Sequence, residues 1–550
     1  MSPQSQPPEL DPQDKASLLI FRVSIYDPNR TLSTWYGSTC SNWTGLSCQN
    51  PTGKVLSLTL SNTNLSGQIH PSLCKLTSLQ SLDLSWNNLS GNIPSCVGAL
   101  RNLRTLNLSR NSLVGAIPGT FVNLKELREV VLRENRDLGG LIPHWLGDLM
   151  NLERIDLNLS HLNLSFNGFS YEISPSLVFS EKLVMLDLSH NGFSGRLPSR
   201  ISETTERLGL ILLDLSHNRF SGVIPLRITE LTSLQALRLS HNLLTGDIPA
   251  RIGNLTDLQV IDLSHNALTG PIPLNIVGCF QLLALVISNN NLSGEIQPEL
   301  DALDSLKILD ISNNKISGEI PLTLAGLKSL EIVDISSNNL SGNLNEAITK
   351  WSNLKYLSLA RNKFGGTLPS WLFKFDKIQM IDYSSNRFSW FIPGDNLNST
   401  RFKNFQTDGS AETPGKVEIK ISANVVAKDE LSFSYSQVTG NISAPPGLTL
   451  LNLSHNCFSG IITEKEGLGK FPGALAGNPE VCVESSGIKC DPANIDASQE
   501  EIYQNELVEG SISIWIFCLS AFISFDFGVL AIFCSACARS YILQTKERAL

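Results

Sequence analysis

A motif repeated along most of the chain limits this protein to a small set of folds. The unit reads L-x-x-L-x-L-S-x-N-x-L-S-G-x-I-P, as in LQSLDLSWNNLSGNIP from Leu79 and LQALRLSHNLLTGDIP from Leu234. From Asn242 to Asn386 its asparagine recurs every 24 residues without a slip. A fixed period of this kind is typical of solenoids, which grow along one axis without dividing into separate domains.

The L-x-L core of each unit predicts a short strand. Successive side chains of a strand point to opposite faces, so the leucines face the core and the residue between them faces outward. A run of amphipathic helices would need a 3.6-residue period, which L-x-L contradicts. The sequence therefore predicts an α/β solenoid, a horseshoe with a parallel β-sheet on its concave face.

The repeated asparagine is expected to hold the coils together. Its amide can bond backbone groups at the bend after the strand and backbone groups of the next coil. Those groups would otherwise be buried without partners, which costs about 1 to 3 kcal/mol each. We therefore expect the asparagines to form a ladder along the solenoid.

Composition and motifs exclude several classes of function. The formal net charge is -9 and no basic stripe occurs, which argues against nucleic acid as a partner. No nucleophile, paired acid and base, or metal-ligand cluster stands out against the repeat, and no kinase motif occurs. We therefore expect no enzyme activity, no catalytic or metal-binding residues and no cofactor.

Cysteines and glycosylation sequons indicate an extracellular domain. Two close pairs flank the repeats, as disulfides do in such domains: Cys40 with Cys48, and Cys482 with Cys490. Cys74 and Cys96 lie 22 residues apart, nearly one repeat, and a third bridge between adjacent coils stays open. Sequons outside the repeated NLS spelling are the stronger evidence for glycosylation: Asn29, Asn42, Asn398 and Asn441.

A long apolar segment near the C-terminus predicts a transmembrane helix over 511–538. It is uncharged except for Asp526, acids without bases precede it, and Arg539, Lys546 and Arg548 follow it. The positive-inside rule places the tail in the cytosol and the repeats outside. The first residues, MSPQSQPPELDPQDK, contain no apolar signal segment. A tail-anchored chain with cytosolic repeats is the alternative, but it would reverse the charge rule, and we expect a leader.

Two faces of this helix are expected to contact a partner helix. An acid at the centre of a span costs about 2.5 to 3.5 kcal/mol on insertion scales, so Asp526 is expected to hydrogen-bond a polar group of the partner rather than lipid. Ser520, Ser524 and Gly528 form a small-residue stripe on roughly the opposite side, where a helix can pack closely. A protonated, lipid-facing acid is the alternative.

The G-x-I-P element, as in GNIP at Gly91 and GPIP at Gly270, resembles plant leucine-rich-repeat proteins. DKASLLIFRVSI with TWYGSTCSNWTGLSC is similar to their N-terminal cap and PGALAGNPEVC to their C-terminal cap. The stretch DNLNSTRFKNFQTDGSAETPGKVEIK is similar to the island of plant receptor-like proteins. The predicted segments are an N-terminal cap (8–54), repeats (55–394), an island (395–447), a last repeat (448–470), a C-terminal cap (471–490), an acidic juxtamembrane stretch (491–510), the span (511–538) and a cytosolic tail (539–550).

The juxtamembrane segment EEIYQNELVEGSISIWIFCLSAFISFDFGVL resembles that of the kinase-less CLAVATA receptor-like proteins of plants. The resemblance implies a single-pass type I protein of the plasma membrane, perception of small secreted CLE-type peptides in meristem control, and a kinase-like membrane partner of the CORYNE type. A pathogen-sensing receptor-like protein and an inhibitor of cell-wall hydrolases are the alternatives, although such inhibitors need no membrane span.

The outward positions of successive strands are the first candidates for a ligand surface. They carry Asp187, Asp214, Arg238 and Asp262. One interpretation is a solvated face of consensus residues, and the other is an acidic concavity for a peptide with basic residues. Peptide-binding kinases of the resembled family often hold the ligand carboxylate with Arg-x-Arg, which is absent from this chain. This absence favours a co-receptor role.

A row of histidines is the second candidate. His190, His217, His241 and His265 occupy the same position in four successive units. Neighbouring strands lie about 4.8 Å apart, which predicts a column of imidazoles. The plain interpretation is that LSHN is a common sequence variant of the repeat and that the histidines have no function of their own. The functional hypothesis is a surface that gains charge as the medium acidifies, with mutual repulsion lowering each proton affinity.

Overall fold

The computed structural model of this chain describes residues 8–141, 160–173, 183–198, 209–367, 377–378, 380–389, 391–392, 459–462 and 480–483. The chain divides into two compact units, Met1–Lys363 and Phe364–Leu550. Within the described residues no helix has the length and hydropathy needed to cross a bilayer, and the predicted span lies outside them.

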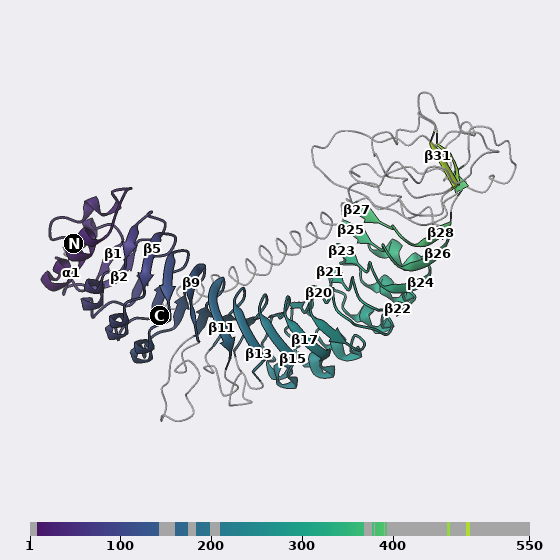
Figure 1. Cartoon of the computed structure of the whole chain (residues 1–550), viewed down its shortest axis with the longest axis horizontal. Helices are drawn as coiled ribbons and strands as arrows, with labels where there is room; N and C mark the ends of the chain where they lie inside the picture. Colours follow the sequence, from purple (N-terminus) through teal and green to yellow (C-terminus); the bar gives the residue numbers. More distant parts are fainter. Residues whose placement is uncertain are drawn as a thin grey trace, which may run out of the picture. The chain divides into compact units, whose positions relative to one another are not determined.

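The first unit is a curved stack of coils with a parallel sheet on its concave side, which confirms the predicted solenoid (Figure 1). Every strand of this sheet after the first pairs in parallel with the strand of the adjacent coil, and β1 pairs antiparallel with β2. In order, the strands are β1 (Leu46–Cys48), β2 (Val55–Thr59), β4 (Ser81–Asp83), β6 (Thr105–Asn107), β8 (Glu129–Val131), β10 (His161–Asn163), β12 (Met185–Asp187), β14 (Leu212–Asp214), β16 (Ala236–Arg238), β18 (Val260–Asp262), β20 (Ala284–Val286), β21 (Ile308–Asp310), β23 (Ile332–Asp334) and β25 (Tyr356–Ser358).

A second parallel sheet, which the sequence did not predict, forms from the N-x-L-S-G segments. Its strands are β3 (Ser66–Gln68), β5 (Asn88–Asn92), β7 (Ser112–Gly115), β9 (Asn135–Gly140), β11 (Asn167–Glu172), β13 (Gly192–Arg196), β15 (Arg219–Val223), β17 (Leu243–Asp247) and β19 (Ala267–Thr269), with β22 (Ser317–Gly318) and β24 (Asn339–Asn343) paired further along. A glycine lies at or next to the end of most of these strands, and at Gly270 the reason is steric. Gly270 has φ +72°, and a Cβ there would lie 2.5 Å from Oδ1 of Asp247.

Short 3₁₀ helices complete the coils on the convex side. They are η3 (Pro71–Lys75), η4 (Ser95–Ala99), η5 (Gly119–Asn123), η7 (Leu226–Glu230), η8 (Ala250–Asn254), η9 (Leu274–Gly278), η10 (Pro298–Ala302), η11 (Leu322–Gly326) and η12 (Glu346–Lys350). The proline of G-x-I-P is the N-cap of many of these helices, as Pro249 is for η8 with φ -55°. Because the proline ring holds φ near −65°, this element sets the return path of the coil.

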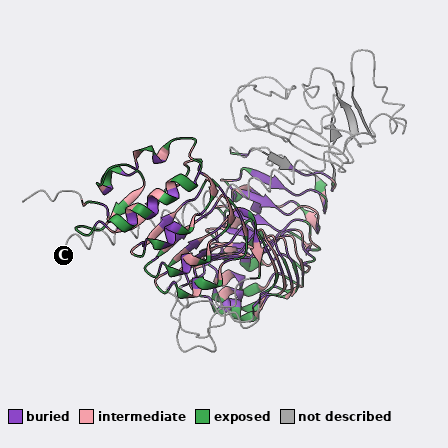
Figure 2. Ribbon diagram, turned by 60° about the vertical axis from the view of Figure 1, so that its left-hand side comes forward, coloured by how far each residue is buried: buried purple, intermediate pink, exposed green. Residues whose placement is uncertain are grey.

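The leucines of each repeat form the core inside the coils (Figure 2, purple). Leu237, Leu239 and Leu244 are completely buried, and so are their equivalents in the next coil, Ile261, Leu263 and Leu268. Burying one leucine side chain contributes about 1.5 to 3 kcal/mol. The same small core therefore repeats from coil to coil, and each coil depends on its neighbours to cover it.

The asparagine ladder is present, but each asparagine bonds the preceding coil rather than the next one. Nδ2 of Asn266 donates to the carbonyl oxygens of Leu239, one coil back, and Leu263, in its own coil, at 3.0 and 3.1 Å. Its Oδ1 accepts from the backbone N–H of Leu244 at 3.0 Å. Asn290 repeats the pattern one coil further along.

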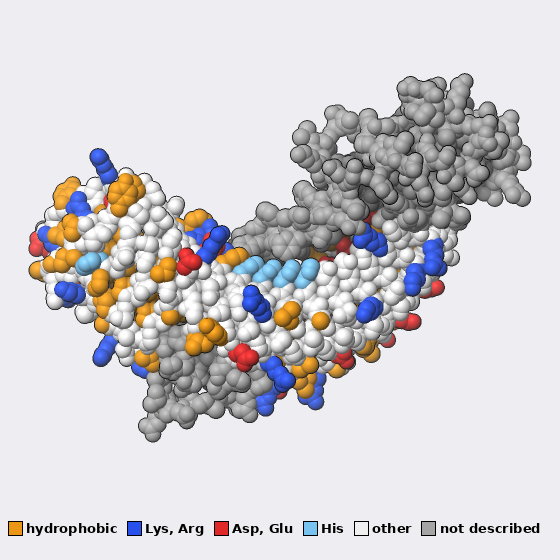
Figure 3. All heavy atoms as spheres, viewed as in Figure 1, with side chains coloured by type: hydrophobic (Ala, Val, Ile, Leu, Met, Phe, Trp, Pro, Cys, Tyr) orange, Lys and Arg blue, Asp and Glu red, His pale blue; other side chains and the backbone are white. Residues whose placement is uncertain are grey.

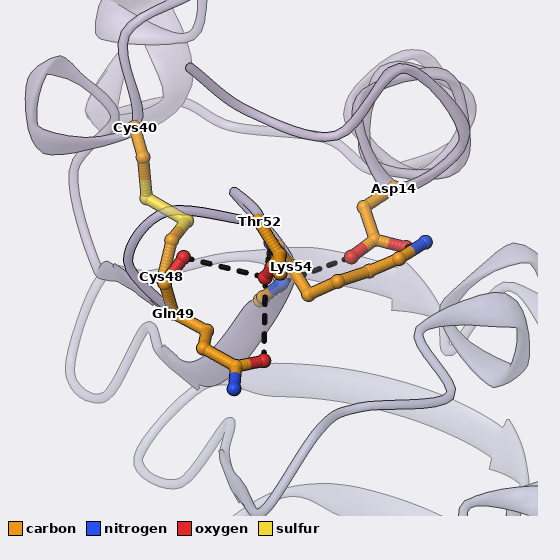
Figure 4. Close-up of a disulfide and its surroundings, with 7 residues drawn as sticks. Asp14, Cys40, Cys48, Gln49, Thr52 and Lys54 are labelled. Atoms are coloured by element: carbon orange, nitrogen blue, oxygen red, sulfur yellow. Dashed lines mark hydrogen bonds and ion pairs between the residues drawn. A yellow bond between two sulfur atoms is a disulfide. The ribbon is translucent and has the colours of Figure 1, made fainter. Parts of the chain in front are cut away.

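The N-terminal end of the stack is closed by α1 (Pro12–Ser24), η1 (Thr31–Thr34) and η2 (Cys40–Asn42). The disulfide Cys40–Cys48 lies beside the turn that carries Thr52 and Lys54, and Asp14 reaches this turn from α1 (Figure 4). The buried carboxylate of Asp14 accepts the backbone N–H of Val55 at 2.9 Å. The disulfide thus joins η2 to β1 within the cap, and the buried hydrogen bond of Asp14 joins the cap to the first coil.

In the second unit, the segments before and after residues 393–458 pair with each other. β29 (Phe391–Ile392) lies parallel to β30 (Ser459–Ile462), which pairs with β31 (Glu480–Val483). β26 (Lys363–Thr367) pairs with β28 (Arg387–Ser389), and β27 (Met380–Asp382) is a further L-x-L-type strand. The predicted island (395–447) lies outside the described residues.

We expect Asn266→Ala and Asn290→Ala each to lower the free energy of unfolding by roughly 1 to 3 kcal/mol, because each leaves buried backbone groups unpaired. Denaturant unfolding of the purified protein measures the change. Asn291→Ala, at an exposed position one residue after the ladder, is the control and should change the stability by less than about 0.5 kcal/mol. Ladder variants as stable as this control would contradict the ladder argument.

Candidate ligand surface

The predicted aspartates of the concave sheet each bond a serine that follows their own strand. Oδ1 of Asp187 accepts both the backbone N–H and the hydroxyl of Ser189, at 3.0 and 2.7 Å. The same pair of bonds forms between Asp214 and Ser216 and between Asp262 and Ser264. The D-L-S motif therefore forms a local cap at the end of the strands that carry it, which the sequence did not reveal.

The second oxygens of two of these carboxylates are also engaged. Nδ2 of Asn163 donates to Oδ2 of Asp187 at 2.9 Å, and Arg238 lies 3.7 Å from Oδ2 of Asp214. Burial and the neighbouring charge of Asp214 raise the pKa of Asp187 to about 6. Burial also raises the pKa of Asp214, while Arg238 acts in the opposite direction. The carboxylates of Asp187 and Asp214 are therefore less available to a basic peptide than the sequence indicates.

The predicted histidine column is confirmed. The ring centroids of His190 and His217 lie 3.9 Å apart, and those of the two following pairs, His217–His241 and His241–His265, lie 4.0 Å apart. The rings are nearly parallel, with interplanar angles of 12 to 14°. All four side chains are half-buried and form a continuous row on the surface of the first unit (Figure 3, pale blue).

A left-handed backbone conformation lines up these rings. Each of the four histidines has φ +52°, and the equivalent residues Asn289 and Asn313 have φ +54° and +49°. Asparagine and histidine are among the non-glycine residues that enter this region most readily. Because the position just before the ladder asparagine takes the same conformation in successive coils, its side chains lie one above another.

The column extends beyond the histidines at both ends, which the sequence reasoning missed. The ring of Phe166, at the same position one coil earlier, stacks on His190 at 3.8 Å, and Arg133 lies 5.7 Å from the Phe166 ring. Nδ2 of Asn289 donates to Nε2 of His265 at 3.3 Å. The signal was available, because Phe166 and Asn289 occupy the x of S-x-N.

The histidines resist protonation, and burial is the larger cause. Burial, followed by the charges of neighbouring histidines, lowers the pKa of His190, His217 and His241 to about 4. The pKa of His265 is also lowered by burial, while Asp262 and Asp310 act in the opposite direction. Repulsion within the column contributes as predicted. The low values mean that the column stays neutral in mildly acidic media and gains charge only as the pH falls to about 4.

The other predicted site residues fall into two groups. The disulfides Cys40–Cys48 and Cys74–Cys96 are present, and the glycosylation candidates Asn29 and Asn42 are exposed. The remaining predictions lie wholly or partly outside the described residues, namely the bridge Cys482–Cys490, the sequons Asn398 and Asn441, and the helix-contact residues Ser520, Ser524, Asp526 and Gly528.

The repeats of this chain match known protein families. Models of the leucine-rich repeat match residues 101–162, 78–100, 158–179, 182–203, 209–231, 233–255, 257–279 and 353–375, and a two-copy model matches 304–350. The receptor-like protein CLAVATA2 of Arabidopsis thaliana is 70% identical in an alignment of 696 positions that covers 99% of this chain and 97% of that protein. The chain belongs to the CLAVATA2 family of receptor-like proteins. Because the alignment is longer than this chain, the Arabidopsis CLAVATA2 contains segments that the chain lacks.

Solved structures similar to this CLAVATA2-family chain include plant receptors. The plant peptide hormone receptor RGFR1, in complex with RGF2, is 30% identical with a TM-score of 0.56, over 79% of this chain and 72% of that one. A TDR receptor is 28% identical with a TM-score of 0.55, over 74% and 69% of the two chains. The family is one of receptors rather than enzymes, and the fold is that of a receptor ectodomain.

We expect the histidine column to make stability depend on pH between 6.5 and about 4. The unfolded histidines take up protons near 6.5 and the folded ones near 4, so acidification favours the unfolded state across this range. Asp187 acts in the opposite direction, because its pKa is raised in the folded protein. Its protonation therefore stabilises the folded state as the pH falls through about 6. The contribution of the column to the pH dependence must therefore be measured by removing one of its histidines.

His217→Asn removes one imidazole and keeps a residue that the equivalent position accepts in Asn289 and Asn313. Its unfolding free energy should fall less than that of the wild type between pH 6.5 and pH 4. Denaturant unfolding at both pH values measures the two slopes. Equal slopes for the variant and the wild type would show that the folded column does not resist protonation.

Proposed function

We propose that this chain is a cell-surface receptor-like protein without a kinase domain that takes part in perceiving small secreted peptides of the CLE type in meristem control. The observation that carries the proposal is the 70% identity to CLAVATA2 over 99% of the chain. The proposed location is the plasma membrane, with the repeats outside and a single span over 511–538. The chain would act by binding rather than by catalysis.

The concave side of the first unit is the proposed face for the peptide. The related receptor RGFR1 was solved with the peptide RGF2, which makes a peptide a reasonable ligand class for this chain as well. Asp187 bonds both Ser189 and Asn163, and Asp214 bonds Ser216 and pairs with Arg238, whereas Asp262 bonds Ser264 through one oxygen. Asp262 is therefore the strongest of the four candidates for contact. Together with the absence of Arg-x-Arg, these bonds favour peptide binding shared with a second receptor chain.

Signalling would pass to a kinase-like membrane partner of the CORYNE type through the transmembrane helix. Asp526 supports this route, because an acid in a span is costly unless it is hydrogen-bonded. A pathogen-sensing receptor-like protein or an inhibitor of cell-wall hydrolases would share the fold. Co-purification from plant membranes tests the proposal, which predicts recovery of a kinase-like membrane protein and fails if a cell-wall hydrolase is recovered instead.

We expect Asp526→Leu to leave membrane insertion intact or improve it, and to reduce recovery of the kinase-like partner, because the variant removes a polar contact between two helices. Quantitative co-purification at equal expression measures the effect. Phe522→Leu, an apolar exchange in the same predicted span, is the matched control and should leave recovery unchanged. Full recovery with Asp526→Leu would rule out Asp526 as the contact.

A further inference from the structure

Tyr171 stands at a position where the neighbouring coils have glycine. It takes the glycine place of N-x-L-S-G in the coil of β11, and its φ is +78°. The equivalent residues of the two adjacent coils are Gly140 and Gly195, with φ +95° and +77°. A bulky side chain in this backbone region is strained, and residues strained in this way cluster at functional positions. Because Tyr171 is 62% exposed, burial in the core does not compensate for the strain.

Four exposed residues beside Tyr171 form a row across successive coils. Each takes the x of G-x-I-P or its equivalent, at the end of β9, β11, β13 or β15 or directly after it, and these strands pair side by side (Figure 1). In order along the stack they are Leu141, Glu172, Arg196 and Val223, here called the lateral row. Leu141 and Val223 are 61% and 60% exposed, and the two charged residues are exposed as well. Hydrophobic, acidic and basic side chains lie close together along this part of the first unit (Figure 3).

The two charges of the lateral row are not paired within the chain. The side chain of Glu172 lies beside Gly195, and that of Arg196 lies beside Gly222, so each covers the glycine of the next coil. Among the residues that the structure describes, neither Glu172 nor Arg196 makes an ion pair or a side-chain hydrogen bond. An exposed acid and an exposed base in adjacent coils are therefore both available to a partner.

The order of the lateral row is self-complementary, because along the stack it reads apolar, acidic, basic, apolar. A two-fold axis between the coils of Glu172 and Arg196 places Glu172 of one copy opposite Arg196 of the other. The same axis places Leu141 opposite Val223. We propose that the lateral row is an isologous contact between two copies of this chain, with the coils of the two copies running in opposite directions.

Tyr171 fits the same arrangement. The two-fold axis places it opposite Gly195 of the other copy, a residue without a side chain, so there is room for the aromatic ring. Exposed tyrosines often contribute strongly to interfaces because they bury a large, rigid surface. The contact thus gives a reason for a strained tyrosine at a glycine position.

The contact is small and is therefore expected to form in the membrane. With strands about 4.8 Å apart, the lateral row extends over roughly 14 Å. Stable interfaces are larger, and small ones belong to weak or transient complexes. Anchoring two copies in one membrane raises their effective concentration, a step that rests on the proposed span over 511–538.

Cysteine cross-linking of the full-length protein in membranes tests the arrangement. One copy carries Leu141→Cys and a differently tagged copy carries Val223→Cys. This mixture should give a mixed disulfide-linked dimer, since disulfides join Cα atoms less than about 7 Å apart. Each variant expressed alone should give none, because the two-fold axis displaces equal residues by about three strand spacings, roughly 14 Å.

Leu322→Cys, at an exposed residue of η11, is the matched control for random collisions with the Leu141→Cys copy. A mixed dimer with this control at the same yield would overturn the proposal, and so would the absence of a Leu141→Cys with Val223→Cys dimer in the membrane fraction. Absence of the protein from the membrane fraction would instead contradict the proposed span, and sedimentation of the wild type and the charge variants in detergent then decides whether the contact exists.

Charge exchange gives a second test. Glu172→Arg and Arg196→Glu each place like charges opposite one another, and each should lower the cross-linking yield at least about tenfold. The double variant with both changes restores opposite charges and should cross-link within about twofold of the original pair. Loss of the contact without rescue in the double variant would overturn the two-fold arrangement.

Tyr171→Gly separates the contact from the stability of the fold. The variant should cross-link less, yet unfold at a higher temperature than the wild type, because glycine adopts the required φ without strain. Cross-linking yield and thermal unfolding measure the two effects. Full cross-linking by Tyr171→Gly would contradict the proposal.

Discussion

Each coil of the first unit is joined to the preceding one by the amide of a single asparagine. At Asn266 this amide donates to carbonyls of two coils and accepts a backbone N–H, so that three buried backbone groups are satisfied by one side chain. Without these bonds the bend after each strand would carry unpaired polar groups in the core. The same contact recurs at Asn290 and at Asn314, so that the buried leucines of successive coils stack around a repeated set of hydrogen bonds.

The same bend determines where functional side chains can gather. The residue just before the ladder asparagine is left-handed in successive coils, with φ +52° at four of them. Its side chain cannot turn into the core, and it lies directly over its equivalent in the next coil. Aromatic and imidazole rings at this position therefore stack, from Phe166 to His265, and Asn289 ends the stack with a hydrogen bond. A structural requirement of the fold thus produces a surface of repeated chemistry.

The concave sheet shows the opposite relation between sequence and surface. Its row of aspartates suggests a strongly acidic face, but Asp187, Asp214 and Asp262 each give one oxygen to a serine two residues later. Burial raises the pKa of Asp187 to about 6, which reduces its charge in mildly acidic media. The carboxylates of this sheet are therefore engaged within the protein, and they offer less free negative charge than the sequence indicates.

The sequence by itself determined the repeat, the L-x-L strands, the asparagine ladder and the order of the histidines, because each recurs with the period of the coil. It also indicated the cap disulfide Cys40–Cys48, because the two cysteines lie close together in the chain. Tertiary structure alone decided which coil each asparagine bonds, the second sheet and the pairing of each aspartate with its serine. It also decided the low pKa of the column, since burial is the larger cause and depends on the packing of neighbouring coils. A local pattern specifies which groups recur, whereas only the stacked fold specifies their contacts and the solvent left around them.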